Sequence, residues 1–119
     1  MKLKIGKGDT IKNIQQSFND TYPFLKIEFV RRKAVQKEKL DGSECIVLPF
    51  DEPTVDIDIN SGQTVKSLET EFKTKANMDI KVYRRFCNVW IETTLTDDWT
   101  LEQQNTEGRL LSELNRLVS

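Results

Sequence analysis

The chain of 119 residues contains no histidine. Histidine is the commonest general base and a usual metal ligand near neutral pH, so its absence excludes Ser-His and Cys-His nucleophile arrangements. Only five glycines are present, and they form no phosphate-binding loop. The sequence therefore predicts no catalytic residues, no metal site and no cofactor, and it favours a protein that is not an enzyme.

Cysteines and long apolar runs are also scarce. Cys45 and Cys87 are too few for a disulfide framework and indicate free thiols. No apolar run approaches the roughly 20 residues of a membrane-spanning helix, and the first ten residues lack a signal-peptide core. We therefore expect a cytoplasmic protein with no membrane segment, folded as a single domain over residues 1–119.

An internal repeat is the clearest positive signal. Residues 10–18 resemble residues 64–72 at a shift of 54 positions, and residues 25–32 resemble residues 78–85 at a shift of 53. In each helical segment, apolar residues recur at i, i+3 and i+7, which is typical of one buried helix face. Apolar and polar residues alternate before and after that segment, which indicates strands.

The two copies cover about residues 1–32 and 53–85, and each predicts a strand, a helix and a strand. Thr10 and Thr64 stand where a helix N-cap hydroxyl is expected. A strand–helix–strand unit written twice predicts an α+β fold with a duplicated β-α-β core of the ferredoxin-like, split βαβ kind.

Three further segments lie outside the copies. Residues 88–94 predict an extra strand after a tight turn near Cys87, and residues 101–117 predict a C-terminal helix that begins with the capping box Thr100 and Gln103. Residues 33–52 contain the turn signal Asp41-Gly42. They predict either a hairpin, with residues 45–48 as its return strand, or an irregular loop.

Charge is distributed unevenly along the chain. Residues 1–40 carry ten basic and four acidic side chains, whereas residues 41–119 carry eight basic and fifteen acidic ones. Acids at positions 56 and 58 are expected opposite lysines 2 and 4 across the central strands. Compensation of these charges within the protein disfavours nucleic-acid binding. Self-association between complementary basic and acidic faces would use the same charges, and the pattern favours it.

Two pairs of arginines are the first candidate site. Arg31 and Arg32 end one predicted strand, and Arg84 and Arg85 end the corresponding strand of the second copy. Guanidinium groups bind carboxylate or phosphate through paired hydrogen bonds. The arrangement predicts either a site for a small anion or two solvated strand ends.

The segment 90–99 holds the second candidate site. Trp90 and Glu92 share one strand face, and an apolar ring on a face without helices needs cover from the C-terminal helix, a second subunit or a ligand. Asp97, Asp98 and Trp99 precede a helix N-terminus, where negative charge is favourable. Helix capping is therefore the simpler role for the two aspartates, and metal binding or catalysis is the alternative.

Cys87 offers a weaker alternative. It follows two arginines, whose charge favours the thiolate form. A thiol enzyme that uses Cys87, or a carboxylate enzyme that uses Asp97 and Asp98, is thus weighed against an inert turn residue.

The run VYRRFCNVWIETT at residues 82–94, followed by TDDWTLEQQN at 96–105, resembles a group of short bacterial proteins of uncharacterised activity. Residues 22–29 also resemble this family, whose pattern is W-[IL]-E-T-T-x-T-D-D-W-T-L-E-x-Q-N. Its members usually have glycine where Cys87 stands. The resemblance implies a bacterial protein and brings no activity, cofactor or ligand.

Taken together, these features predict a non-enzymatic interaction module. Its expected partner is itself, as a homodimer that uses the Trp90 face or an edge strand, or another protein. The alternative is a regulatory domain that binds a small anion through the paired arginines.

Overall fold

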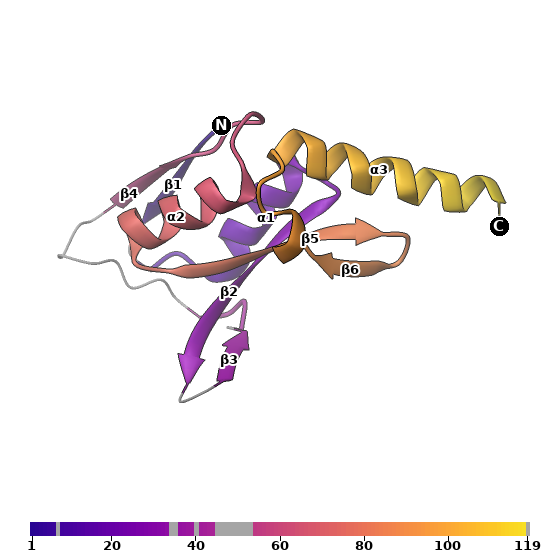
Figure 1. The fold of residues 1–119 in the computed structure, drawn as a ribbon. Helices are drawn as coiled ribbons and strands as arrows, with labels where there is room; N and C mark the ends of the chain where they lie inside the picture. The colour runs from indigo at the N-terminus through magenta and orange to yellow at the C-terminus, as the bar shows by residue number, and fades with distance from the viewer. Residues whose placement is uncertain (7, 34–35, 40, 45–53, 119) are drawn as a thin grey trace.

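The computed structural model describes residues 1–6, 8–33, 36–39, 41–44 and 54–118; for residues 31–33, 36–38 and 115–118 it describes the backbone only. The elements follow in the order β1 (Lys2–Gly6), α1 (Ile11–Thr21), β2 (Leu25–Lys33), β3 (Gln36–Lys39), β4 (Thr54–Asp58), α2 (Val65–Ala76), β5 (Asp79–Phe86), β6 (Val89–Glu92), a 3₁₀ turn η2 (Thr94–Thr96) and α3 (Leu101–Val118) (Figure 1). The predicted α+β class and C-terminal helix are confirmed.

The strands form two antiparallel sheets. β1 pairs with β4, and the second sheet has the strand order β3-β2-β5-β6. α1 contacts β1 and β2, and α2 contacts β4 and β5, so each helix joins the two sheets. This arrangement is compatible with a split β-α-β core, but the strands are divided between two sheets rather than continuous in one.

Hydrogen-bonding groups from other segments occupy the edges of β2 and β5, where further strands would have to pair to form one continuous sheet. The amide groups of Gln15 and Asn19 on α1 donate to the β2 carbonyls of Ile27 and Leu25, at 2.9 and 2.8 Å. On β5, the carbonyl of Val82 accepts from the backbone N–H and the hydroxyl of Thr93. Edge groups that are already paired do not recruit a further strand.

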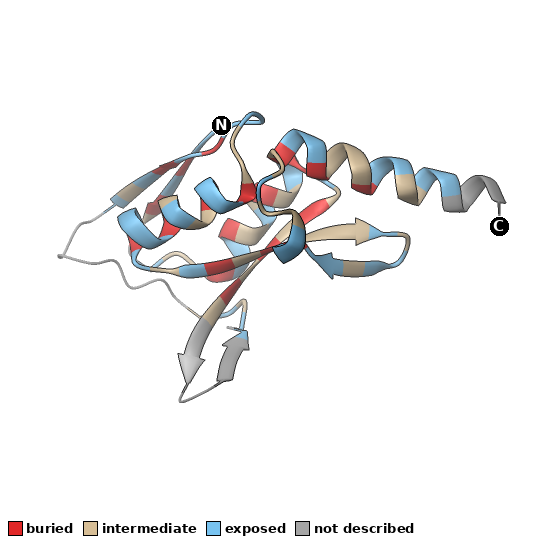
Figure 2. Ribbon diagram, in the orientation of Figure 1, coloured by how far each residue is buried: buried red, intermediate tan, exposed pale blue. Residues whose placement is uncertain are grey.

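One hydrophobic core joins the two sheets and the three helices. It contains the alternating residues of β1, β2, β4 and β5, the apolar stripes of α1 and α2, and the first residue of α3. Figure 2 shows these buried positions on the helix and strand faces that point inward. Phe18 and Phe72, which correspond in the two helices, are both fully buried, and each contributes roughly 1.5–3 kcal/mol through removal of its ring from water.

The expected placement of acids on β4 opposite lysines on β1 is confirmed by the register of the two strands. Lys2 lies opposite Asp58, and Lys4 lies opposite Asp56. Opposite charges on directly facing residues stabilise an antiparallel pair by about 0.2–1 kcal/mol.

Two hairpins have matching registers. In the first, Val30 of β2 pairs with Lys39 of β3; in the second, Tyr83 of β5 pairs with Glu92 of β6. Both members of the second pair lie 53 positions after those of the first. The early part of the 33–52 segment is therefore a hairpin strand, while the proposed return strand at 45–48 lies outside the described residues.

The prediction that Asp41-Gly42 turns this hairpin is wrong. β2 ends at Lys33, which pairs with Gln36 at the start of β3, so Asp41-Gly42 lies beyond the hairpin rather than between its strands. β3, the second strand of this hairpin, has the polar sequence QKEK, which carries none of the apolar alternation that marks a strand. Asp41-Gly42 instead forms a second turn, which lies over the start of α1.

The segments that follow the two hairpins cap the two helices in the same way. At α1, the N–H groups of Ile11 and Lys12 donate to the carbonyls of Glu44 and Gly42. The hydroxyl of Thr10 accepts from the third residue of the helix, at 3.3 Å. These bonds satisfy three of the N–H groups that a helix N-terminus leaves unpaired.

At α2, the N–H groups of Val65 and Lys66 donate to the carbonyls of Trp99 and Asp97. The Thr64 hydroxyl accepts from the third helix residue, at 3.1 Å. Both predicted threonine caps are thus confirmed.

α3 crosses β5 at Gly108. A Cβ atom on Gly108 would lie 3.0 Å from Phe24 Cβ and 3.2 Å from the carbonyl oxygen of Arg85. Close approach of helix and strand therefore explains a glycine within a helix. The capping box that starts the helix is confirmed: Thr100 N donates to Gln103 Oε1 at 2.8 Å, and Gln103 N donates to Thr100 Oγ1 at 3.1 Å.

Candidate functional site

The outward face of the β3-β2-β5-β6 sheet carries alternating cations and aromatic rings. Lys26 Nζ lies 5.3 Å from the ring centroid of Tyr83 and 5.1 Å from that of Trp90. Lys39 Nζ lies 4.6 Å from the Tyr83 ring, and Arg85 Cζ lies 5.5 Å from the Trp90 ring. We call these five residues the cation–ring ladder. Each contact is within the range of a cation–π attraction.

Cross-strand pairing assembles this ladder from four strands. Lys26 faces Tyr83 in the β2–β5 register, and Arg85 faces Trp90 in the β5–β6 register. Opposite residues in an antiparallel pair point to the same side of the sheet. Lys39 reaches the same face from β3. Segments far apart in sequence thus contribute to one surface.

The sheet face that carries the ladder also carries carboxylates, and two of them pair with lysines. Lys26 Nζ lies 3.2 Å from Glu28, and Lys81 Nζ lies 3.8 Å from Glu92. Within the described part of the chain, Lys39 and Arg85 form no ion pair. Two positive charges on this face therefore remain without a carboxylate partner among the described residues.

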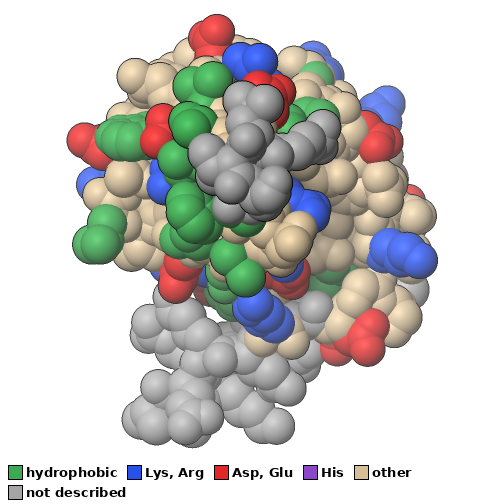
Figure 3. Space-filling view, turned by 90° about the vertical axis from the view of Figure 1, so that its right-hand side faces the viewer, with side chains coloured by type: hydrophobic (Ala, Val, Ile, Leu, Met, Phe, Trp, Pro, Cys, Tyr) green, Lys and Arg blue, Asp and Glu red, His purple; other side chains and the backbone are tan. Residues whose placement is uncertain are grey.

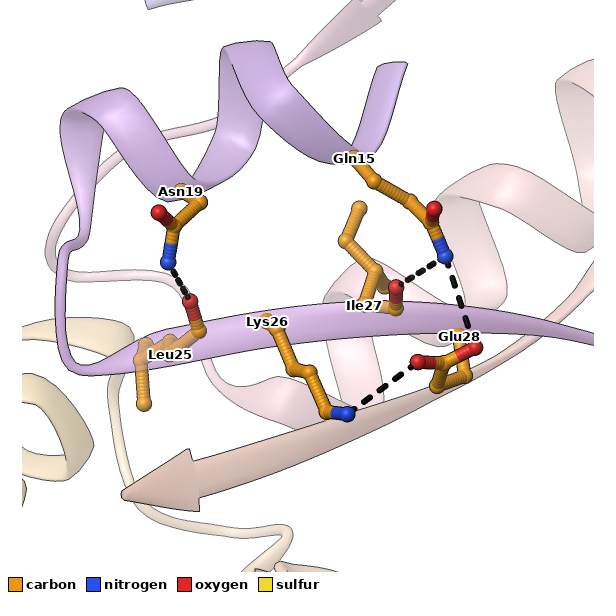
Figure 4. A network of polar contacts seen from close by, with 6 residues as sticks. All are labelled: Gln15, Asn19, Leu25, Lys26, Ile27 and Glu28. Atoms are coloured by element: carbon orange, nitrogen blue, oxygen red, sulfur yellow. Dashed lines mark hydrogen bonds and ion pairs between the residues drawn. The ribbon is translucent and has the colours of Figure 1, made fainter. Parts of the chain in front are cut away.

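A groove of about 220 Å³ lies beside the ladder, between α1 and β2. Lys12, Gln15 and Asn19 line it from the helix, and Lys26 and Trp90 line it from the sheet. Figure 4 shows how the amides of Gln15 and Asn19 point down onto β2. These contacts hold the groove wall in place.

Glu28 connects the groove wall to the ladder. It accepts from Gln15 Nε2 at 3.4 Å through one carboxylate oxygen, and its other oxygen pairs with Lys26 (Figure 4). The Lys26 ammonium is therefore held from three sides, by one carboxylate and two rings.

The predicted arginine pairs are not brought together. Arg84 and Arg85 point to opposite faces of β5: Arg84 donates from Nη1 to Gln104 Oε1 at 2.8 Å, beneath α3, whereas Arg85 belongs to the ladder. Consecutive strand residues always alternate in this way. Arg31 and Arg32 lie in the backbone of β2 opposite β3, and their side chains are outside the described atoms.

The remaining predicted residues lie in different places. Trp90 is half-buried on the ladder, and Glu92 is exposed beside Lys81. Asp98 is exposed, and Asp97 acts through its backbone carbonyl at the start of α2.

Trp99 contacts the guanidinium group of Arg84, which lies 5.5 Å from the ring centroid. It also lines a second hollow of about 430 Å³ on the first turns of α3, together with Glu102 and Glu107. Two carboxylates give this hollow the opposite charge to the ladder.

Cys87 is the first residue of the two-residue turn between β5 and β6, and its φ is +58°. A left-handed backbone at this position suits glycine better than cysteine. Its carbonyl accepts from Arg85 Nε at 2.9 Å. The local geometry accounts for Cys87 as a turn residue, and no hydrogen bond to its thiol is found among the described residues.

Gln104 is a structural residue that the sequence pattern does not reveal. It is fully buried; its Nε2 donates to the carbonyl and hydroxyl of Thr96 at 2.7 and 2.8 Å, while its Oε1 accepts from Arg84. A buried amide with all its polar groups paired fixes the position of α3 on β5. Only the position of Gln104 one turn after the buried Leu101 hints at this role.

An apolar surface lies at the end of the molecule where α3 and the β5–β6 hairpin project. Its exposed fractions are 39% for Phe86, 57% for Val89, 39% for Ile91, 46% for Leu110 and 57% for Leu114. Figure 3 views this end and shows hydrophobic side chains gathered there. We call these five residues the apolar end.

The apolar end and the ladder lie on opposite faces of the hairpin. Ile91 pairs with Arg84, which contacts α3, so Val89 and Ile91 point to the α3 side. Trp90 points to the ladder side. α3 thus does not cover Trp90, and the three apolar hairpin residues on its own side, Phe86, Val89 and Ile91, also stay exposed.

In the described ranges, no three His, Cys, Asp or Glu residues are grouped as metal ligands would be. None of the described helices has both the length and the apolar character required to cross a membrane. No protein-family model matches the chain, and neither a curated protein nor a solved structure matches it.

Proposed function

We propose that the protein is a non-enzymatic interaction module that associates with a second copy of itself through β6. The observation that carries this proposal is the combination of an edge strand with the apolar end. β6 is the last strand of its sheet, and both residues on its α3 side are exposed and apolar.

An edge strand has a row of unpaired N–H and C=O groups, which can pair with another strand. Natural edges are usually protected by charge, as in the β3 sequence QKEK at the other edge of this sheet. β6 has the sequence VWIE and lacks such protection except at Glu92. This contrast supports β6 as the interface.

Two copies of β6 can pair antiparallel about a two-fold axis at Trp90. Val89 of one copy then lies opposite Ile91 of the other, so apolar residues face apolar residues on the α3 side. A two-fold axis closes the assembly as a dimer. The α3 residues Leu110 and Leu114 lie on that same side, and they enlarge the apolar area that the dimer covers.

Sedimentation velocity from about 1 µM to about 1 mM tests this proposal. We expect a concentration-dependent dimer for the wild type and a monomer for Ile91→Lys, because the lysine would place an unpaired charge against the apolar Val89 of the second copy. The control Thr70→Lys adds the same charge on the surface of α2, away from β6, and should dimerise like the wild type.

Circular dichroism checks that Ile91→Lys still folds, which its partly exposed position favours. A wild type that stays monomeric at the highest concentration contradicts the proposal. A folded Ile91→Lys protein that dimerises as strongly as the wild type contradicts it too.

We also propose that the two halves descend from one duplicated unit longer than the repeat in the sequence. The matched hairpin registers and the matched carbonyl caps of α1 and α2 support a unit that continues through residue 44 in the first half and residue 99 in the second. We also propose a bacterial origin and a cytoplasmic location, on the basis of the sequence alone.

A further inference from the structure

We propose that the cation–ring ladder is a docking surface for an extended acidic segment of a partner protein. The ladder side chains lie on the face of the hairpin opposite Val89 and Ile91, although Trp90 also lies at the proposed two-fold axis of the dimer. The ladder is complete within one copy of the chain, so the proposal does not depend on dimerisation.

The spacing of the cations is compatible with an extended chain that carries acidic side chains on one face. Lys26 Nζ and Lys39 Nζ are each measured to the Tyr83 centroid, so they lie no more than about 10 Å apart; a similar limit of about 11 Å holds for Lys26 Nζ and Arg85 Cζ around Trp90. In an extended peptide, side chains on one face recur about every 6.6–6.8 Å. Alternate Asp or Glu residues therefore reach successive cations.

The rings hold these cations in place. A lysine in solution samples many rotamers, and ordering it on binding costs free energy. Here the Lys26 ammonium is already fixed between two rings and Glu28, and Lys39 and Arg85 each lie over one ring. Preorganised charges at Lys39 and Arg85, which have no carboxylate partner among the described residues, give an acidic ligand two favourable contacts from the start.

The same geometry disfavours nucleic acid as the ligand. Proteins that bind single strands stack bases on open aromatic faces, whereas each ring of the ladder already has two cations over it. Glu28 and Glu92 also lie on this face and repel a continuous phosphate backbone. A peptide can place its N–H groups, hydroxyls or basic side chains beside those carboxylates.

The groove next to the ladder extends the surface. Lys12 adds a further cation there, and the β2 edge at its floor is occupied by the amides of Gln15 and Asn19. A bound segment consequently lies across the sheet face and does not add a strand to β2.

Fluorescence anisotropy with a labelled peptide of about ten alternating Ser and Glu residues tests the proposal, using the full chain at low salt. The double variant Lys39→Gln/Arg85→Gln removes the two cations that lack a carboxylate partner. The matched control Lys2→Gln/Lys66→Gln removes two lysines outside the ladder and the groove. Two comparison ligands are used: a Ser-Gln peptide of the same length, and an oligothymidylate with the same net charge as the Ser-Glu peptide.

We expect saturable binding of the acidic peptide that weakens about tenfold in the ladder variant and less than about twofold in the control. The Ser-Gln peptide should not bind. Equal weakening in both double variants, or no saturable binding to the wild type, overturns the proposal. Tighter binding of the oligothymidylate than of the peptide also overturns it and assigns the face to nucleic acid. Thermal melting establishes that both variants are folded.

Discussion

The two halves of the molecule share a framework and differ in the surface that it presents. Each half has a strand, a threonine-capped helix, a hairpin and a further segment whose carbonyls cap the helix. The hairpin of the first half ends in the polar strand β3, and that of the second half ends in the largely apolar strand β6. The two halves therefore share the elements that form the core, and their hairpins present different surfaces.

The halves also differ at their C-terminal ends. The second half continues into α3, which crosses β5 and is held there by the buried amide of Gln104. α3 contributes Leu110 and Leu114 to the apolar end. The candidate interface thus lies where the second half departs from the first.

The largest effects are expected from the two corresponding phenylalanines. Phe18→Ala and Phe72→Ala should each lower the free energy of unfolding by about 3–5 kcal/mol, because both rings are fully buried and leave cavities. Urea denaturation measures both losses. If one variant loses less than half as much as the other, the two helices are not equivalent in the core.

A smaller loss is expected at a contact that belongs to the second half. Gln104→Leu removes three hydrogen bonds and leaves Arg84 and the Thr96 carbonyl without this partner, so we expect a loss of about 3 kcal/mol. Gln16→Leu, at a position where the amide bonds an exposed neighbour, is the control and should change stability by less than about 0.5 kcal/mol. Equal effects at the two glutamines would show that α3 is not fixed by this amide.

The helix caps provide a finer comparison. Thr10→Ala and Thr64→Ala each remove one hydroxyl that accepts from a helix N–H group, and each should cost about 1 kcal/mol. Thr74→Ala, at an exposed position within α2, should not destabilise the protein. A loss of stability in only one of these two variants would show that the two caps are not equivalent.

The smallest effect concerns Asp41, in the turn that caps α1. Hydrogen bonds from the Ser43 backbone N–H and hydroxyl lower the pKa of Asp41 below its ordinary value of 3.8. A lowered folded-state pKa stabilises the protein above the unfolded pKa, and this contribution disappears as pH falls through the folded value. In the second half, the described contacts of the capping segment include no corresponding carboxylate bond.

We therefore expect Asp41→Asn to melt slightly below the wild type at pH 7, with the difference vanishing as the pH falls through the lowered pKa of Asp41. Asp98→Asn, which removes an exposed carboxylate with no hydrogen bond in the described structure, is the matched control. A difference between Asp41→Asn and wild type that persists unchanged into acid would contradict the role of the Asp41 charge.

Local signals in the sequence predict much of the framework. Threonine caps, the capping box of Thr100 and Gln103, and the apolar stripes all act within a few residues of chain, so they are visible in the sequence. β3 is harder to place, because QKEK has no apolar alternation. The division into two sheets depends on Gln15 and Asn19 reaching the edge of β2, and propensity carries no such information.

The candidate site is predictable only in part. Trp90 and Arg85 stand out because aromatic and basic residues are conspicuous in sequence, yet pairing Arg84 with Arg85 overlooks the alternation of a strand. Lys26, Lys39 and Tyr83 join the ladder through cross-strand register. Register is a property of the folded sheet, so these three residues carry no local signal of their role.

Hydrogen–deuterium exchange at low and high protein concentration tests most directly whether the two hairpins differ in function. Both β3 and β6 are edge strands, and both have outward N–H groups that exchange freely in a monomer. We predict that the β6 amides become protected as concentration rises from about 1 µM to about 1 mM, while the β3 amides do not change. Protection that appears at β3 instead, or at neither edge, would contradict the assignment of the interface to the second hairpin.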